Sequence, residues 1–478
     1  MLDAGYSAFS LEYWRRVTMI GITNPFEQAA RSFVVFREPI ELGIAPCTED
    51  TVMIMKAQPA KNEECVTAGL SLFQALVEDF QPRDFDICFW DGSTWHAEES
   101  SPAKFTLILN HPEALQNMFS PPLEVALGEA YAYGDYDIEG DFESAFRLAD
   151  YLIEHEWKFA DRVNLALQLA RVRSKLPSRA DSLQASLHGR KHSESRDRLA
   201  VTHHYNLSNE FFALWLDPRL VYSCAYFASP DQDLAGAQET KLDLICRKLK
   251  LQSGERFLDI GCGWGALIIH AVQNYRVKAT GITLSEPQAR LARERARQAG
   301  LSEDECQVLV LDYRELDDAA SYDKVASVGM VEHVGGSQLS TYFERVLYLL
   351  KPGGAFLNHG IAGTRYGEAS SRREFLRRYV FPDVEMLPLD IVLRHAEQAG
   401  FEIRHVESLR EHYVLTLRTW RRNLENAATE ARKLVSDETV RIWRLYLAAS
   451  AYSFAKGNHS VFQSLLTKPV QTPTRRTG

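Results

Sequence analysis

The sequence predicts an α/β protein in which a doubly wound, mostly parallel sheet follows a smaller α+β module. In the C-terminal part of the chain, short apolar segments alternate with segments of helical periodicity, the pattern of parallel strands joined by crossover helices. Between residues 66 and 165, helical segments surround a predicted hairpin and a further strand, over a length typical of one domain. We therefore expect four parts: 1–65 without assignment, 66–165 as a first domain, 166–201 as a basic linker, and 202–470 as a second domain.

The signals in the first domain are local. A helix is predicted over 66–80 from apolar residues at helical spacing, and a hairpin around Asp91-Gly92, a pair that favours tight hairpin turns. Residues 104–110 predict a third strand. Three more helices are predicted over 111–119, 121–134 and 141–159, the last with Asp141 as its N-cap.

The second domain alternates strand and helix signals. Its predicted strands are 256–260, 278–284, 306–311, 322–329, 354–360 and 401–408. Its predicted helices begin at Trp264, Glu286 and Gln338. Before it, residues 171–198 hold eight Lys or Arg against three Asp or Glu, which indicates a solvated linker or, alternatively, a contact with an anionic membrane.

The composition limits the class of protein. With 478 residues, 45% of them hydrophobic, the chain can bury more than one core. No run approaches the ~18 apolar residues that a spanning helix needs, and the first residues lack the apolar run of a signal peptide, so we expect a cytoplasmic protein. Seven scattered cysteines without a C-x-x-C pair argue against a disulfide framework and a zinc site. A net charge of −10 argues against a nucleic-acid partner.

A glycine-rich turn, LDIGCGWG (258–265), joins the first strand of the second domain to its helix. Glycines let the backbone approach a ligand, and the helix N-terminus offers it N–H groups. The spacing is G-x-G-x-G, whereas the dinucleotide fingerprint is G-x-G-x-x-G with a later carboxylate, and the second strand here ends in Thr283-Leu284-Ser285. A turn at 350–354, LKPGG, resembles one of class I methyltransferases. We therefore predict S-adenosylmethionine as the ligand, with NAD as the alternative.

The residues that should contact this ligand follow the carboxyl ends of the strands, where open α/β sheets bind ligands. Two of them have other interpretations, since Leu284 can be a core residue and Asp312 can cap a turn. The predicted contacts are Tyr222, Ser223, Asp259, Gly261, Gly263, Gly265, Thr283, Leu284, Gln288, Asp312 and Tyr313.

From about residue 202 the chain resembles the cyclopropane fatty acid and mycolic acid cyclopropane synthase family, over about 270 residues. The motifs that carry the resemblance are HHYNLSN (203–209), YSCAYF (222–227), the glycine turn with its Trp264, SVGMVEHVG (327–335) and EHY (411–413). Residues 66–165, with GEAYAYGDYDIEGD, look like the lipid-binding N-terminal domain of members that act on phospholipids. The resemblance implies the Rossmann-like fold of class I S-adenosylmethionine-dependent methyltransferases.

The resemblance also implies the chemistry: methyl transfer from S-adenosylmethionine to a double-bond carbon of an unsaturated phospholipid acyl chain, then closure of a cyclopropane ring. Family members hold a bicarbonate ion as the base, and histidine, tyrosine and carboxyl groups suit the binding of such an ion. The residues assigned to it, and hence predicted as catalytic, are Cys224, Glu332, His359, Ile361 through its backbone, and Tyr413.

Aromatic residues near this set could face the sulfonium or the carbocation, because a cation is stabilised over an aromatic ring. Tyr222, Tyr226 and Phe227 are the candidates. A buried cysteine or a group of aromatic residues can equally serve only packing, and that alternative applies to Cys224 and to these three residues.

Two positions depart from the family pattern. Asn358 stands where better-known members carry a more apolar residue, which puts the surroundings of the ion, and with them ring closure, in doubt. Ser450 stands where a cysteine is common, which excludes a nucleophilic thiol there. A methylene- or methyl-branched product is therefore an alternative outcome of the same chemistry. A non-catalytic lipid-binding protein and a small-molecule methyltransferase are alternatives of other classes.

The implied partner is a phospholipid bilayer with unsaturated acyl chains, approached from the cytoplasm at its inner face. Residues 365–381 follow the strand that carries His359 and hold five Arg against two Glu. We expect this segment to lie over the mouth of the site and to contact anionic headgroups, with an ordinary amphipathic helix as the alternative. A homodimer is left open.

Overall fold

The computed structural model describes residues 50–155, 189–205, 207–229, 231–363 and 374–470, together with residues 167, 169 and 183. The chain divides into two compact units, Met1–Arg179 and Ala180–Gly478. The division falls inside the segment 166–201 that the sequence indicates as a linker. Most of that segment, and residues 1–49, lie outside the described residues.

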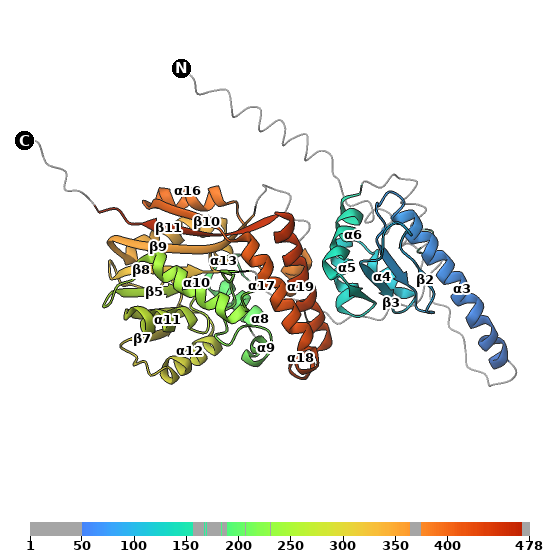
Figure 1. The fold of residues 1–478 in the computed structure, drawn as a ribbon, viewed down its shortest axis with the longest axis horizontal. Helices are drawn as coiled ribbons and strands as arrows, with labels where there is room; N and C mark the ends of the chain where they lie inside the picture. The colour runs from blue at the N-terminus through green and yellow to red at the C-terminus, as the bar shows by residue number, and fades with distance from the viewer. Residues whose placement is uncertain are drawn as a thin grey trace, which may run out of the picture. The chain divides into compact units, whose positions relative to one another are not determined.

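The first unit contains a four-stranded sheet with the order β2-β1-β3-β4 (Figure 1). The strands are β1 (Phe85–Cys88), β2 (Thr94–Trp95), β3 (Phe105–Leu109) and β4 (Tyr136–Gly140). The predicted hairpin is present: β1 and β2 are antiparallel, and Gly92 adopts a positive φ of 87° in the turn between them. Strand β4 was not predicted, and it pairs antiparallel with β3.

The helices of the first unit are α3 (Asp50–Leu76), α4 (Glu113–Met118), α5 (Leu123–Ala132) and α6 (Phe142–Glu154). Helix α3 begins well before the predicted start at Val66. The predicted N-cap of the last helix is confirmed, because the Asp141 side chain accepts a hydrogen bond from the backbone N–H of Glu143 at 3.1 Å.

The second unit contains a seven-stranded sheet with the order β10-β11-β9-β8-β5-β6-β7. Its strands are β5 (Arg256–Ile260), β6 (Lys278–Thr283), β7 (Cys306–Val310), β8 (Tyr322–Val328), β9 (Leu350–Gly363), β10 (Glu402–Ser408) and β11 (His459–Thr467). Strands β5 to β9 pair in parallel, which confirms the predicted doubly wound α/β class. Strand β11 was not predicted, and it runs antiparallel to both β9 and β10.

Strand β9 begins earlier than the prediction at Gly354. The predicted turn at 350–354 is an irregularity inside this strand, because the partner of β8 shifts from Leu350 to Ala355 while β8 advances only from Tyr322 to Lys324. Gly353 adopts a positive φ of 78° in this irregularity. Beyond this irregularity, the pairing of β9 with β8 is regular from Ala355 to His359.

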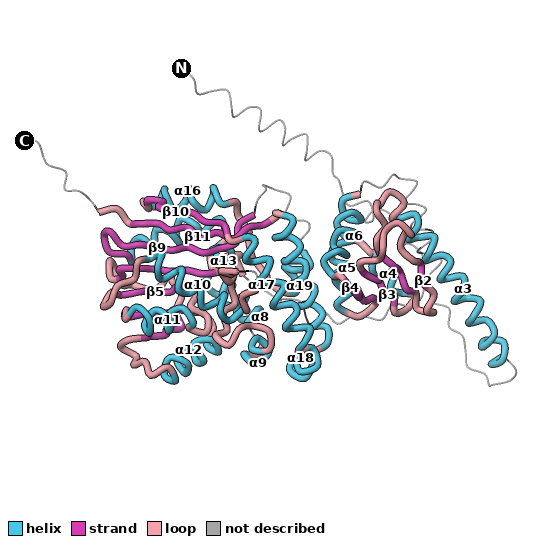
Figure 2. Tube along the Cα trace, in the orientation of Figure 1, coloured by secondary structure: helices cyan, strands magenta, loops and turns pink. Residues whose placement is uncertain are grey.

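Helices cover both faces of this sheet (Figure 2). One buried cluster joins the sheet to α10 (Leu234–Leu249), α11 (Ala266–Tyr275) and α12 (Glu286–Gln298). A second joins the other face to α13 (Val331–Val334), α14 (Leu339–Leu349) and α16 (Leu389–Ala399). The remaining elements are α8 (Glu194–Tyr205), α9 (Asn209–Ala213), the 3-10 helix Gly336–Gln338, α15 (Glu374–Tyr379), α17 (Arg410–Asn426), α18 (Ala428–Leu434) and α19 (Asp437–Lys456).

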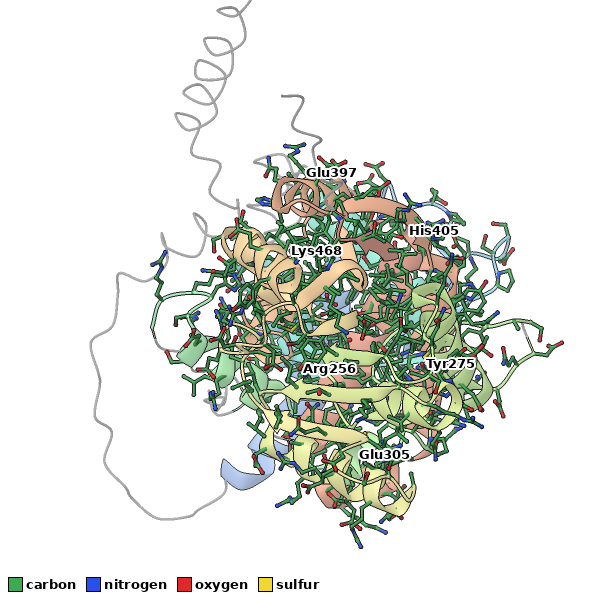
Figure 3. All side chains as sticks on the ribbon, turned by 90° about the vertical axis from the view of Figure 1, so that its left-hand side faces the viewer. Arg256, Tyr275, Glu305, Glu397, His405 and Lys468 are labelled. Atoms are coloured by element: carbon green, nitrogen blue, oxygen red, sulfur yellow. The ribbon has the colours of Figure 1, made fainter. Side chains whose placement is uncertain are left out.

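The two ends of the strands differ. At one end, α17 and α19 lie side by side (Figure 1). Figure 3 looks onto the other end, where Arg256 begins β5, Glu305 precedes β7 and Lys468 follows β11. The parallel strands begin at this second end, so their carboxyl ends point toward α17 and α19.

Candidate active site

A cavity of about 160 Å³ lies at the carboxyl ends of β5, β6, β7 and β8. Ten of the eleven residues predicted to contact S-adenosylmethionine line it: Tyr222, Ser223, Asp259, Gly261, Gly263, Thr283, Leu284, Gln288, Asp312 and Tyr313. We call it the donor cavity. Their roles in binding stay predictions, but the chain does bring them together.

The three glycines of the turn share a positive φ but differ in their structural roles. Each adopts a positive φ, of 81° at Gly261, 53° at Gly263 and 82° at Gly265. A Cβ added at Gly263 would meet nothing within 4 Å, so a side chain there would enter open space. Gly265 does not line the cavity, because it precedes α11 and an added Cβ would lie 3.0 Å from the Cβ of Ala292. Its small size serves the close approach of α11 to α12.

Side chains after the second and third strands are held by hydrogen bonds. The Thr283 hydroxyl donates to the Gln288 side-chain oxygen at 2.9 Å, which fixes both at the end of β6. Asp312 accepts from the guanidinium of Arg314 at 2.8 and 2.7 Å and also from its backbone N–H at 2.9 Å. Asp312 therefore caps a turn and lines the cavity as well.

A second cavity, of about 340 Å³, adjoins the first. We call it the acceptor cavity, and all five predicted catalytic residues line it: Cys224, Glu332, His359, Ile361 and Tyr413. Four residues line both cavities: Tyr222, Ser223, Gly329 and His333. The two cavities thus share part of their lining.

Glu332 lies on the short helix α13, between β8 and α14, with its side chain buried. Burial raises the pKa of this carboxyl to about 7, although hydrogen bonds from its own backbone N–H and that of Ile361 oppose the shift. Its Oε2 atom has no hydrogen-bond partner among the described residues. A carboxyl with a pKa near neutrality can both give and accept a proton.

His359, in the middle of β9, is held in one tautomer by β11. The side-chain amide of Gln463 lies 3.1 Å from Nδ1 of His359, and the oxygen of that amide accepts from Nζ of Lys248 at 2.7 Å. Because Lys248 can only donate, the amide NH₂ must face His359, whose Nδ1 then accepts and whose Nε2 carries the proton. Burial lowers the pKa of the imidazole well below its usual value, so the ring is neutral.

The Nε2–H group of His359 has no hydrogen-bond partner among the described residues, although it is buried. An unpaired buried donor costs about 1–3 kcal/mol. This donor and the unpaired oxygen of Glu332 belong to residues that line the same cavity. Together they form a site that a small ligand with both an acceptor and a donor would satisfy.

The thiol of Cys224 is not a nucleophile in this setting. Burial raises its pKa far above the ordinary value, and its Sγ–H group lies 3.2 Å from the carbonyl oxygen of Ala225. Tyr413, on α17, is buried against the rings of Phe454 and Trp420 at centroid distances of 4.7 and 6.1 Å.

The aromatic lining differs from the expectation. Tyr222 lines both cavities, but Tyr226 and Phe227 line neither. Tyr226 instead stacks on His412 at 4.3 Å, and the backbone N–H of Phe227 donates to Nδ1 of the same histidine at 3.1 Å. Consecutive residues in this irregular segment point in different directions, which the motif alone does not reveal.

Several lining residues were not predicted. Tyr446, Ser450 and Phe454 recur every four residues on α19, so they share the face that lines the acceptor cavity. The Tyr222 hydroxyl lies 3.3 Å from that of Tyr446. His333 lines both cavities, and burial lowers its pKa to about 4, which keeps it neutral. Helical spacing was a usable signal for the α19 residues.

The two departures from the family pattern lie in different places. Asn358 does not line either cavity: its side-chain oxygen accepts from the Tyr342 hydroxyl at 3.0 Å, on the face of β9 opposite to His359. No contact between Asn358 and either cavity therefore supports the expected effect of this residue on the surroundings of the ion. Ser450 does line the acceptor cavity, so no thiol is available at that position.

Part of the predicted membrane segment borders the acceptor cavity. Residues 364–373 lie outside the described residues, but Leu376, Arg377 and Phe381 line the cavity. Arg378 forms an ion pair with Glu374 at 3.1 Å, as the amphipathic-helix alternative expects. Among the helices that the structure describes, none is long and apolar enough to span a bilayer.

Two family models match the chain. The model of mycolic acid cyclopropane synthetase matches residues 192–464, and a model described only as a domain of unknown function matches residues 72–154. A "Probable fatty acid methyltransferase" of Pseudomonas putida is 39% identical over 385 residues, covering 80% of this chain and 91% of that protein. The "Cyclopropane-fatty-acyl-phospholipid synthase" of Escherichia coli is 35% identical over 283 residues, covering 59% of this chain and 71% of that protein.

Solved structures resemble the second unit. The cyclopropane synthase MmaA2 of Mycobacterium tuberculosis matches with a TM-score of 0.54 and 32% identity, over 58% of this chain and 99% of that one. The mycolic acid cyclopropane synthase CmaA1, solved with SAH and CTAB, matches with a TM-score of 0.54 and 34% identity, over 57% of this chain and 98% of that one.

Proposed function

Because the chain belongs to the mycolic acid cyclopropane synthetase family, whose members modify lipid acyl chains with S-adenosylmethionine, we propose that it is a cyclopropane-fatty-acyl-phospholipid synthase. The observation that carries the proposal is the pair of adjoining cavities, one behind the glycine turn and one lined by a buried acid–base set. The chain carries every residue that the resemblance predicts for the glycine turn and for that set, which argues against a non-catalytic lipid-binding protein.

The proposed reaction has two steps. One alkene carbon attacks the methyl group, the S–CH₃ bond breaks, and the sulfur leaves with the bonding electrons as a thioether. The other alkene carbon becomes a carbocation. The new methyl group then loses a proton, and the electrons of its C–H bond close the ring onto the cation. The site must therefore stabilise a cation and hold a base close to it.

Tyr222 is suited to the first requirement because it lines both cavities. An aromatic face gains about 2 kcal/mol with a desolvated cation. Tyr446 and Phe454 extend the aromatic wall on the acceptor side.

Bicarbonate fits the second requirement, and we propose that it binds in the acceptor cavity. Donors from His359 Nε2–H and the Tyr413 hydroxyl would hold its oxygens, the Ile361 backbone N–H would be shared between the ion and Glu332, and Glu332 would accept its proton. When bound, the ion supplies the base for the second step. Because the pKa of Glu332 is about 7, both its protonated and its ionised forms are populated near neutral pH, so this residue can accept the proton and pass it on.

A methylene- or methyl-branched product is the second candidate. It shares the first step, but a hydride then moves from the methylated carbon to the neighbouring cationic carbon, and the methyl group loses a proton to leave a terminal methylene group. A later reduction of this group gives the methyl branch. The similarity to a protein named a probable fatty acid methyltransferase favours it, since that similarity extends over 80% of the chain.

Lipid analysis tests the function and separates the two products. The membrane lipids of cells that express the chain should gain one CH₂ per modified acyl chain by mass spectrometry, with cyclopropane protons in the NMR spectrum. A terminal alkene would support the branched product instead. If the lipids of the cells are unchanged although the purified protein binds S-adenosylmethionine, a small-molecule acceptor is favoured.

A second experiment tests the bicarbonate ion. Carbonate-free buffer should abolish turnover of the purified protein, and added bicarbonate should restore it. Turnover that does not depend on bicarbonate would remove that ion from the proposal.

We also propose peripheral association with the cytoplasmic face of a membrane, supported by Arg377 and Phe381 at the acceptor cavity. Each arginine near an anionic surface contributes about 1 kcal/mol, screened by salt. Replacing Arg372, Arg373, Arg377 and Arg378 with Gln should weaken binding to anionic vesicles at low salt. Turnover on detergent-dispersed lipid should fall much less, because that assay bypasses docking. If the quadruple variant binds vesicles like the wild type, the contact lies elsewhere, for example on the first unit.

A further inference from the structure

A row of polar side chains crosses three neighbouring strands and ends at the acceptor cavity. Strands β9, β11 and β10 are adjacent in the sheet (Figure 1), and their register places His359 opposite Gln463 and Gln463 opposite Glu407. Directly opposite residues of antiparallel strands point to the same face of a sheet. The three side chains therefore form one line, from the buried His359 to the half-buried Glu407 on the edge strand β10.

Lys248 joins this row from α10. Its Nζ donates to the side-chain oxygen of Gln463 at 2.7 Å and to a carboxylate oxygen of Glu407, and its side chain is 13% exposed. Neither Lys248 nor Glu407 lines the donor or the acceptor cavity. A largely buried ion pair adds little net stability, because the cost of removing two charges from water offsets their attraction. The effect of this pair follows instead from the amide that it contacts.

The Gln463 amide has two orientations, which differ by exchange of its oxygen and its NH₂ group. In the observed one, the oxygen accepts from Lys248 and the NH₂ group donates to Nδ1 of His359. In the inverted one, the NH₂ group would face the ammonium group, donor against donor. The oxygen would face His359, so the ring would carry its proton on Nδ1 and an unshared electron pair on Nε2.

Protonation of both ring nitrogens does not compete with these two states. Burial, together with the positive charges of Lys241 and Lys248, lowers the pKa of His359 well below its usual value. The ring is therefore neutral, and the orientation of one amide decides which of its nitrogens donates.

We propose that Lys248 and Glu407 are positioning residues that act on His359 through Gln463. Lys248 fixes the orientation of the amide and thereby makes Nε2 of His359 a donor to the anion proposed for the acceptor cavity. Glu407 holds the ammonium group of Lys248 against the amide. The consequence for bicarbonate rests on the proposed function, whereas the control of the tautomer does not.

Glu407 also determines what happens when Lys248 is removed. The Glu407 carboxylate and the Gln463 oxygen both contact the Lys248 ammonium group, so the two side chains lie close together. Without that ammonium group, the carboxylate is a charged acceptor within reach of the amide NH₂ group, and the amide should invert. A hydrogen bond to a charged group corresponds to a preference of about 10- to 100-fold. The tautomer with the proton on Nδ1 should then predominate.

¹⁵N NMR of histidine-labelled protein reads the tautomer directly, and the signals of His359 are those that disappear in His359→Asn. The wild type should carry the proton on Nε2. In Lys248→Met, which keeps an unbranched side chain and removes the charge, the proton should move to Nδ1. The bicarbonate concentration for half-maximal turnover should rise about 10- to 100-fold, because only a minor fraction of the protein is competent to bind the ion. At saturating bicarbonate, kcat should stay within about threefold of the wild type.

The double variant Lys248→Met/Glu407→Leu distinguishes this role from a merely structural one. It removes both charges, so neither amide orientation is strongly favoured and NMR should show both tautomers. Half-maximal turnover should then return to within about threefold of the wild-type bicarbonate concentration. A structural role predicts the opposite, because the second substitution would add to the damage of the first. Since apolar replacement of a buried ion pair is often neutral for stability, the double variant should fold even if Lys248→Met does not.

Arg247→Met and Glu402→Gln are the matched controls. Arg247 lies next to Lys248 on α10 and pairs with Asp243, with its side chain 60% exposed. Glu402 lies on β10 and pairs with Arg404, with its side chain 54% exposed. Both variants should keep the wild-type tautomer and the wild-type bicarbonate dependence.

A ring protonated only on Nε2 in Lys248→Met, or in the double variant, would overturn the proposal. So would a double variant that needs more bicarbonate than Lys248→Met. If the wild type turns over without bicarbonate, the proposed base is refuted, and the NMR result alone decides the positioning role: a proton that moves to Nδ1 in Lys248→Met supports it, and one that stays on Nε2 refutes it.

Discussion

Replacing Glu332 with Gln should remove most turnover and yet stabilise the protein at alkaline pH. The carboxyl has an ordinary pKa of 4.5 and a folded-state pKa of about 7, because burial disfavours its charge. As the pH rises from about 4.5 to about 7, the unfolded chain loses this proton while the folded one keeps it. The wild type therefore loses stability over that window, and the loss is complete above about pH 7. A Gln side chain does not titrate and escapes it.

The magnitude follows from the two pKa values. One pKa unit corresponds to 1.36 kcal/mol, so wild-type Glu332 costs about 3 kcal/mol at pH 8 and about 1 kcal/mol at pH 5. With roughly 2 °C per kcal/mol for a unit of this size, Glu332→Gln should raise Tm by roughly 6 °C at pH 8 and roughly 2 °C at pH 5. Turnover should fall about 10²- to 10⁴-fold, as for other positioned acid–base groups.

Scanning calorimetry in carbonate-free buffer measures both values of Tm. Glu385 provides a matched control on the wall of the same cavity. Hydrogen bonds from His192 and Lys191 hold its pKa well below the usual range, so its ionised form stabilises the fold. Glu385→Gln should therefore lower Tm at pH 8, opposite in sign to Glu332→Gln. A Tm difference for Glu332→Gln that is the same at both pH values would refute the argument, because the carboxyl would then not be buried in its neutral form.

Three further outcomes are expected. Gln463→Leu removes the donor to Nδ1 of His359, so ¹⁵N NMR should show a mixture of ring tautomers and turnover should fall about 10-fold or more; a single Nε2–H tautomer with full turnover would contradict the assignment. Gly263→Val puts a β-branched residue at a φ of 53° and a side chain into the donor cavity, so calorimetry should detect no donor binding, and an unchanged affinity would contradict the placement. Asn358→Leu removes the acceptor of the Tyr342 hydroxyl and should cost about 1–3 kcal/mol in denaturant unfolding, while the ratio of ring to branched product stays constant; a shifted ratio would mean that Asn358 acts on the ion after all.

Local signals located most of the sheet. Strand β5 and the start of α12 match the predicted positions. Both could be predicted because their signals, apolar residues followed by glycines and an N-cap at Ser285, lie in adjacent residues of the sequence. Strand β11 was missed for a physical reason. It lies between β9 and β10 in the sheet, and both of its faces are packed against buried clusters, so polar residues such as Gln463 are buried and the alternation of a half-exposed strand is absent.

The candidate site was predicted as a set of residues but not as a network. The motifs supplied Glu332 and His359, whereas Gln463 lies 104 positions from His359 and meets it only through the register of two antiparallel strands. Lys241, which is buried and lines the donor cavity, was missed in the same way, because its helix carries no feature that distinguishes a buried lysine from an exposed one. Residues that support others across the fold have no local signature.

The place of β11 in the sheet sets the order in which the two cavities can be completed during synthesis. Strands β5 to β8 and the helices around them can assemble once residue 328 has left the ribosome, which is enough for most of the donor side. Strand β9 has no neighbour on its other side until residues 459–467 follow, about 100 residues later. At roughly 5–20 residues per second, a nascent chain spends several seconds or longer with His359 on an unpaired strand edge. Most of the donor cavity can thus form early in synthesis, whereas the acceptor cavity can be completed only after β11 has been made.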